Sequence, residues 1–272
     1  MIGNIVKMKV QLAAPVEYQL PLDDALLDLN PHIGGRIRLD YQGEINCIAC
    51  GRKTAKSYAQ GYCYPCFISL AECDMCIVKP ETCHFDAGTC RDAEWAQQHC
   101  MQSHFVYLAN SSGIKVGITR GSQIPTRWID QGAGQALPIF KVASRYQSGL
   151  LEVAIKQHVS DRTDWRKMLK SDAEPQDLAA MRDRLVEACI AQITELRSQF
   201  GDENIQFLAD EPVVDIQYPV EQYPEKVKSL NLDKTPQIEG VLMGIKGQYL
   251  ILDSGVINIR KYSGYKLAVD LI

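Results

Sequence analysis

Two pairs of cysteines with the spacing CxxC constrain this chain more than any other feature of its sequence. Cys47 and Cys50 form the first pair, Cys63 and Cys66 form the second, and twelve residues lie between the pairs. Each pair can present two thiolates to one ion at about 2.3 Å, so the two pairs together complete a closed tetrahedral zinc site. The bound ion then supplies folding free energy to a segment too short to build its own core. The spacing therefore predicts structural zinc, with an iron–sulfur cluster, a redox pair or four unconnected core cysteines as rival interpretations.

A second group of metal-binding residue types follows directly. Residues 73 to 104 hold five cysteines and three histidines, which are more ligands than one zinc ion uses. The simplest second zinc site has the spacing CxxC-x6-C-x6-C and takes as ligands Cys73, Cys76, Cys83 and Cys90, with Cys100 as an alternative. A rival set draws on Cys90, His99, Cys100 or His104. The histidines, His84 included, are left out of the predicted set because a lone histidine is more often a satisfied polar residue than a ligand.

Composition places the chain among soluble globular proteins. Of its 272 residues, 46% are hydrophobic and 23% are charged, and this length allows one large domain or two to three small ones. The apolar runs are far shorter than the ~18 residues that cross a bilayer, and the first residues lack a continuous apolar signal segment. Nine of the ten cysteines lie between Cys47 and Cys100, in spacings that suit metal better than disulfides. We therefore expect a cytoplasmic protein with no membrane partner.

Alternating apolar residues predict strands near both ends of the chain. The segment GGRIRLDYQ places Ile37, Leu39 and Tyr41 on one face, and the C-terminal segment contains at least three strand candidates separated by Lys-Gly and Ser-Gly turns. Because sheets bury their edges by pairing, the N- and C-terminal strands are predicted to form one small barrel or sheet.

The middle of the chain has a different pattern. Residues 105–170 read as strand, strand, loop, strand and helix, and an amphipathic helix of about seven turns then runs from Pro175 to Gly201. The predicted fold class is α+β. The predicted segments are an N-terminal β segment that pairs with the C-terminal strands (1–46), a cysteine-rich zinc module resembling a zinc ribbon (47–104), a small α/β core (105–170), a long helix with a connector (171–212) and a C-terminal β-rich segment (213–272).

Charge is distributed unevenly along the chain. The net charge is -4, yet residues 105–170 contain ten Lys and Arg against four Asp and Glu, whereas residues 171–272 contain ten against seventeen. A net positive segment inside an acidic protein attracts phosphate locally, although a solvated helix face produces the same count. Nucleic acid, either DNA or RNA, is therefore the predicted partner, and a protein partner is the alternative.

The basic segment also carries a set of short motifs in a recognisable order. Tyr107 lies on its first predicted strand, Lys115 to Gly117 form a Lys-Val-Gly triplet on the second, Arg127 follows a loop, and Glu152 lies on the later helix. Over about Phe105 to Leu169 this order resembles the GIY-YIG nuclease superfamily, which implies a small three-stranded sheet flanked by helices. The whole chain also resembles an uncharacterised bacterial family known as a domain of unknown function.

The resemblance implies a catalytic role for four residues. Hydrolysis of a phosphodiester needs a cation beside the phosphoryl oxygens, a group that positions water and a donor to the developing charge. By the resemblance, Glu152 would bind one Mg2+ or Mn2+ ion and Tyr107 would orient the water. Arg127 would hold the phosphate and Lys115 would add positive charge beside it.

The same segment departs from the family pattern in three places. Val116 replaces a tyrosine, the loop before Arg127 is about two residues longer than usual, and Gln131 stands where some members have histidine. Three functions therefore remain open: a metal-dependent endonuclease, a nucleic-acid-binding protein that has lost turnover, and a zinc-stabilised scaffold for protein interactions.

Overall fold

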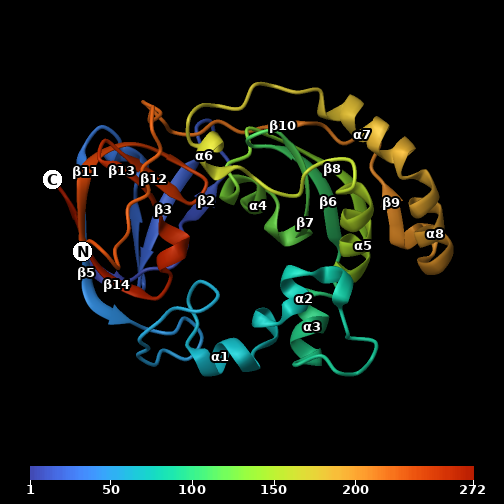
Figure 1. The fold of residues 1–272 in the computed structure, drawn as a ribbon, viewed down its shortest axis with the longest axis horizontal. Helices are drawn as coiled ribbons and strands as arrows, with labels where there is room; N and C mark the ends of the chain where they lie inside the picture. The colour runs from blue at the N-terminus through green and yellow to red at the C-terminus, as the bar shows by residue number, and fades with distance from the viewer.

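The computed structural model describes all residues, 1–272, and contains two sheet-based parts joined by the cysteine-rich segment (Figure 1). Both termini lie in the same part, which is built mainly from the two ends of the chain. Helices and sheets are both present, so the predicted α+β class is confirmed. None of the helices combines the length and the apolar character that a bilayer crossing requires.

The terminal part consists of two antiparallel sheets, which we call the terminal β domain. The larger sheet has the order β1-β14-β5-β11-β12-β13, with the bounds β1 (Ile2–Asn4), β5 (Arg36–Ile45), β11 (Gln237–Lys246), β12 (Tyr249–Leu252), β13 (Gly255–Asn258) and β14 (Tyr265–Leu271). The smaller sheet contains β2 (Lys9–Gln11), β3 (Glu17–Leu22) and β4 (Ala25–Asp28). The N- and C-terminal strands therefore pair as predicted, in open sheets and not in a closed barrel. Ile37 and Leu39 of β5 are buried in the core of this domain.

The second part, the central core, is built on β6 (His104–Asn110), which pairs antiparallel with β7 (Ile114–Arg120) and β8 (Gln135–Val142). These are the three strands expected from the sequence. Two short strands from later in the chain, β9 (Ile205–Phe207) and β10 (Val214–Asp215), extend the sheet by pairing with the other edge of β8. Helix α4 (Thr126–Asp130) follows β7, and α5 (Arg145–Ile155) packs against β6 and β7.

The prediction of a single continuous helix between Pro175 and Gly201 is wrong. The structure has two helices, α7 (Leu178–Ala188) and α8 (Ile190–Phe200), separated at Cys189, whose ψ of 12° departs from helical geometry. The first helix begins after Asp177, whose carboxylate accepts a hydrogen bond from the Ala180 amide. Both helices bury apolar residues in one cluster with β6 and β8, so the apolar periodicity continues across the break and hides it.

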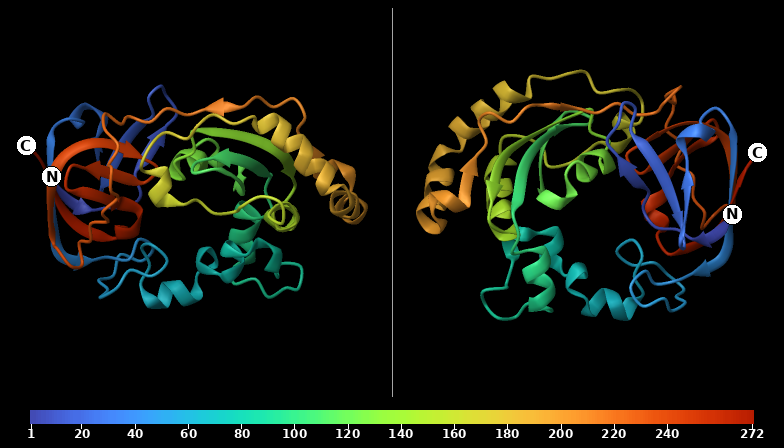
Figure 2. Two further views of the ribbon diagram at one scale, coloured as in Figure 1. Left: turned by 45° about the horizontal axis from the view of Figure 1, so that its top comes forward. Right: turned by 180° about the vertical axis from the view of Figure 1, so that it is seen from behind.

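The cysteine-rich segment contains only short helices, α1 (Tyr64–Ser69), α2 (Met75–Val78) and α3 (Ala93–His99). Both views in Figure 2 show it passing from the terminal β domain to the central core along one side of the molecule. The remaining helical pieces are α6 (Trp165–Met168) and the 3-10 turns η1 (Asn30–His32), η2 (Ala71–Cys73), η3 (Pro80–Thr82), η4 (Gly121–Gln123), η5 (Asp202–Asn204) and η6 (Ile259–Tyr262).

Candidate functional site

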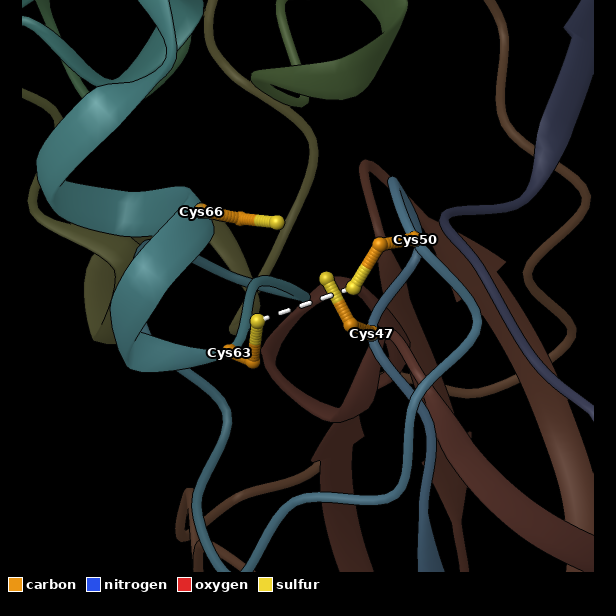
Figure 3. Close-up of side chains that lie close together, drawn as sticks. All are labelled: Cys47, Cys50, Cys63 and Cys66. Carbon is orange, nitrogen blue, oxygen red and sulfur yellow. Dashed lines mark hydrogen bonds between the residues drawn. The ribbon is translucent and has the colours of Figure 1, made fainter.

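The four cysteines of the two CxxC pairs converge. Cys47 and Cys50 lie in the loop after β5, while Cys63 precedes α1 and Cys66 lies in its first turn (Figure 3). All four sulfurs lie within 4.8 Å of one another, and the Sγ atoms of Cys50 and Cys63 are 3.7 Å apart. A tetrahedral zinc ion with bonds of about 2.3 Å separates its sulfur ligands by about 3.8 Å, so this cluster could bind zinc with little movement.

The surroundings of this cluster favour ionised sulfur at one end. Burial raises the pKa of the Cys47 thiol, but hydrogen bonds from the backbone of Cys63, Cys50 and Ala49 outweigh that effect and bring the pKa to about 6. Hydrogen bonding to Cys63, together with burial, raises the pKa of Cys66. Four adjacent thiolates repel one another, so the four thiols do not all ionise together unless a cation compensates their charge.

The second predicted set of four cysteines does not come together. Cys76, Cys83 and Cys90 line one small cavity, but the fourth thiol in that lining belongs to Cys100 and not to Cys73. Cys73 ends η2, immediately before Asp74 begins a new helix. Burial and the charge of Glu72 raise the pKa of its thiol to about 11, although the positive charge of Arg91 acts in the opposite direction. The assignment of Cys73 as a ligand of a second site is therefore corrected.

The three histidines have protein partners. The Nδ1 atom of His84 lies 2.8 Å from Thr89 Oγ1, and His99 Nδ1 lies 2.8 Å from the Trp95 carbonyl while its ring stacks on Trp95. His104 is fully buried at the start of β6, and burial lowers its pKa to about 4. These contacts leave the Nε2 atoms of two histidines uncommitted: that of His84 lies 3.6 Å from Asp74 Oδ2, and that of His104 is buried without a hydrogen-bond partner.

A cleft of about 750 Å³ lies where the two sheet-based parts and the cysteine-rich segment meet. The central core contributes most of its lining, including Lys115 to Arg120, Arg127, Gln131, Arg145, Glu152 and Asp161. The cysteine-rich segment contributes Ala59, Gln60, Glu72, Ile77, Val78 and Pro80, and the terminal β domain contributes Lys7 and Arg260.

Three of the four residues predicted to be catalytic line this cleft, namely Lys115, Arg127 and Glu152. Tyr107 lies behind them, fully buried, and its phenol oxygen accepts a hydrogen bond of 2.7 Å from Gln131 Nε2. The phenol lies against Gly117, where a Cβ atom would be only 2.7 Å from the Tyr107 oxygen. The glycine of the Lys-Val-Gly triplet is therefore needed for the tyrosine to occupy this place.

Basic side chains outnumber acidic ones in the cleft lining. Six are basic, namely Lys7, Lys115, Arg120, Arg127, Arg145 and Arg260, and four are acidic, namely Glu72, Asp130, Glu152 and Asp161. Only one ion pair joins the two sets, between Lys7 and Asp130 at 2.8 Å. Burial, and then repulsion from Arg127, lower the pKa of Lys115 to about 8 and also lower that of Arg260. The cleft thus holds crowded positive charge that an anionic ligand would stabilise.

Glu152 is the acidic residue of α5 in the cleft, and its carboxylate makes no hydrogen bond or ion pair within the protein. Burial raises the pKa of this carboxyl group, and the positive charges of Lys156 and Arg145 offset part of the shift. A partly buried carboxylate without a protein partner could bind a divalent cation, which would supply the missing counter-charge.

Four basic residues of the cleft, Lys7, Arg120, Arg145 and Arg260, were missed by the sequence reasoning. Arg145 lies two helical turns before Glu152 on α5, so the seven-residue spacing on one helix face could have revealed it. Its Nε atom is buried without a hydrogen-bond partner. Arg260 lies in η6, remote from the central core in sequence, and no local pattern marks it.

The fold and the site define an α+β protein with a four-cysteine cluster that could bind zinc. Residues 34–267 match a protein family described as "Protein of unknown function (DUF2797)", and the chain belongs to this family. The chain matches no curated protein and no solved structure. The matched range includes both cysteine groups and every cleft residue except Lys7.

Proposed function

We propose that this protein acts on nucleic acid as a divalent-metal-dependent phosphodiesterase of the GIY-YIG type, with structural zinc at Cys47, Cys50, Cys63 and Cys66. The observation that carries the proposal is the cleft in which Lys115 and Arg127 lie with the unpaired carboxylate of Glu152. Phosphodiester hydrolysis needs positive charge and a metal ligand in one concave site.

Each residue has a role that follows from its surroundings. Arg127 makes no ion pair within the protein, so its guanidinium is free to hold the phosphate with two donors. Lys115 adds a second positive charge, and Glu152 would hold Mg2+ or Mn2+, which polarises the phosphoryl group when bound. Gln131 positions the Tyr107 phenol at the back of the cleft through their 2.7 Å hydrogen bond.

The burial of Tyr107 favours a second candidate function, which is nucleic-acid binding without turnover. Its phenol is not exposed and does not line the cleft, and burial raises its pKa even though Arg127 and Gln131 act in the opposite direction. A water molecule in the cleft has no direct access to such a phenol. In this alternative the same cationic surface binds phosphate and Glu152 stays metal-free.

Cleavage assays with Glu152→Gln distinguish the two functions. Labelled single-stranded DNA, duplex DNA and RNA are incubated with Mg2+ or Mn2+, and the expected result is cleavage by wild type that falls at least about 100-fold in the variant. Glu195→Gln, an exposed glutamate of α8, is the matched control and should retain wild-type activity. Binding without any cleavage by wild type supports the second function. If no substrate is bound or cut, both are rejected.

A further inference from the structure

We propose that Cys76, Cys83, Cys90 and Cys100 bind a second zinc ion, and that this ion holds the wall of the cleft that positions Arg145. The four thiols line a single cavity of about 20 Å³. A void of this size has room for roughly one water-sized probe, and most of its other lining residues are apolar, namely Ala71, Ile77, Phe85, Trp95 and Ala96. No three of these sulfurs lie within 4.8 Å of one another, so the four turns would draw together around the ion when it binds. Four thiols around so small an apolar space then make a closed structural zinc site.

The four thiols come from separate turns of the chain. Cys76 lies in α2, Cys83 follows η3, Cys90 precedes α3 and Cys100 is the C-terminal cap of α3. Between residues 71 and 100 only Ala71, Pro80, Ala96 and Cys100 are buried, and no strand is present. Such a segment has too little core to fix four turns by packing, which is the situation in which small modules use a metal ion.

The same segment contains a second possible set of metal ligands, but two of its side chains already have partners within the protein. Asp74, Cys76 and His84 place possible ligand atoms within 4.8 Å of one another. The Asp74 carboxylate, however, accepts a hydrogen bond from the Cys76 amide and pairs with Arg91 Nε at 2.7 Å. His84 Nδ1 contacts Thr89. Neutralising Asp74 with an arginine removes the charge that would attract a cation, so the four thiols are the better site.

The proposed zinc site is connected to the cleft through Arg145. The guanidinium of Arg145 donates to the carbonyl oxygen of Ile77, the residue after Cys76, and its amide donates to the carbonyl of Cys100 at 2.8 Å. Ile77 also lines the cleft. Ile77, which follows a proposed ligand, therefore holds the side chain of Arg145, and Cys100, a proposed ligand itself, holds its backbone. Zinc at this site fixes where the arginine presents its charge.

Zinc content tests the ligand set independently of any activity on nucleic acid. Full-length protein is purified under reducing conditions and its metals are measured by inductively coupled plasma mass spectrometry. Wild type should contain two zinc ions per chain, Cys90→Ser one, and the matched control Cys73→Ser two. One zinc ion in wild type, loss of an ion in Cys73→Ser, or iron in place of zinc would overturn the proposal.

Alkylation of the wild-type protein gives a second test that does not depend on how a variant folds. Iodoacetamide is added with and without a zinc chelator, and each cysteine is followed by peptide mass spectrometry. The four proposed ligands should react slowly until the chelator is present, because zinc-bound thiolates are protected. Equal rates under the two conditions at these four positions would refute the site.

The role of the zinc ion in positioning Arg145 rests on the proposed function. It predicts that Cys90→Ser and Arg145→Met weaken oligonucleotide binding by similar factors. Unchanged binding in Cys90→Ser would refute that role alone.

Discussion

Lys115 carries its charge in an unfavourable place, and this sets how the cleft should respond to pH. The residue lies on β7, is 6% exposed and has no carboxylate partner, and its pKa falls to about 8 through burial and repulsion from Arg127.

The motif positions Tyr107, Lys115, Arg127 and Glu152 could be identified in the sequence because they lie in order on regular elements. The burial that separates Tyr107 from the cleft could not, since alternation along β6 does not reveal that both faces of this strand are covered.

Oligonucleotide binding should weaken as the pH rises through about 8. A bound phosphate favours the protonated form of Lys115, so affinity is highest below this pKa and declines as the proton is lost. Lys115→Met should bind more weakly at about pH 7 and should lose this pH dependence, whereas Lys170→Met, an exposed lysine outside the cleft, should keep it. Fluorescence anisotropy at fixed ionic strength measures the effect, and an identical pH profile in Lys115→Met would contradict it.

At the scale of elements, α5 connects the central core to the cysteine-rich segment. Gly149 allows the helix to approach η3, because a Cβ atom at this position would lie 2.6 Å from Pro80 Cβ and 2.7 Å from the Glu81 amide nitrogen. The same element carries Arg145 and Glu152. Close packing of α5, together with the hydrogen bonds from Arg145 to Ile77 and Cys100, holds this helix at the cleft.

Gly149→Ala should destabilise the protein. Alanine raises helix propensity by about 1 kcal/mol, but the added methyl group meets backbone atoms, and overpacking of this kind costs about 1–3 kcal/mol. We expect a net loss of about 1 kcal/mol in the free energy of unfolding, measured by urea denaturation. Gly134→Ala is the control, since its Cβ would meet the nearest atom at an ordinary 3.7 Å. A Gly149→Ala protein more stable than wild type would argue against tight packing of α5.

At this scale the sequence did not reveal the break between α7 and α8 or the grouping of the second set of cysteines. Cysteine spacing counts residues along the chain, but the change of direction between η2 and α2 leaves Cys73 outside the cavity that Cys76, Cys83 and Cys90 line. The first group was assigned correctly because each of its CxxC pairs is a local turn whose geometry follows from its own four residues. That Cys100 lines the same cavity as Cys76 depends on the path of the whole segment.

In the molecule as a whole, the terminal β domain completes the cleft. Lys7 pairs with Asp130 at the end of α4, Gln248 donates to the same carboxylate at 2.9 Å, and the Tyr218 hydroxyl donates to the Ala133 carbonyl at 2.8 Å. These contacts hold the helix that carries Arg127. Arg260 then adds positive charge from the domain's own side. The sequence predicts each sheet separately but contains no local signal for how the sheets face one another.

Arg260→Met should therefore weaken nucleic-acid binding even though the residue lies outside the central core. Loss of one phosphate contact should reduce the slope of log affinity against log salt by about one. Lys261→Met removes the neighbouring exposed lysine and should leave the slope unchanged. The measurement is a salt titration of oligonucleotide binding. Equal slopes for wild type and Arg260→Met would remove the terminal β domain from the proposed binding surface.

The position of β5 between β11 and β14 also dictates an order of events during synthesis. This strand ends at Ile45, yet both of its neighbours follow residue 236 in the chain. A growing polypeptide therefore emerges from the ribosome with β5 open at both edges while the cysteine-rich segment and the central core are made. Open strand edges favour pairing with other chains, so translation that stalls before β11 would leave an aggregation-prone fragment.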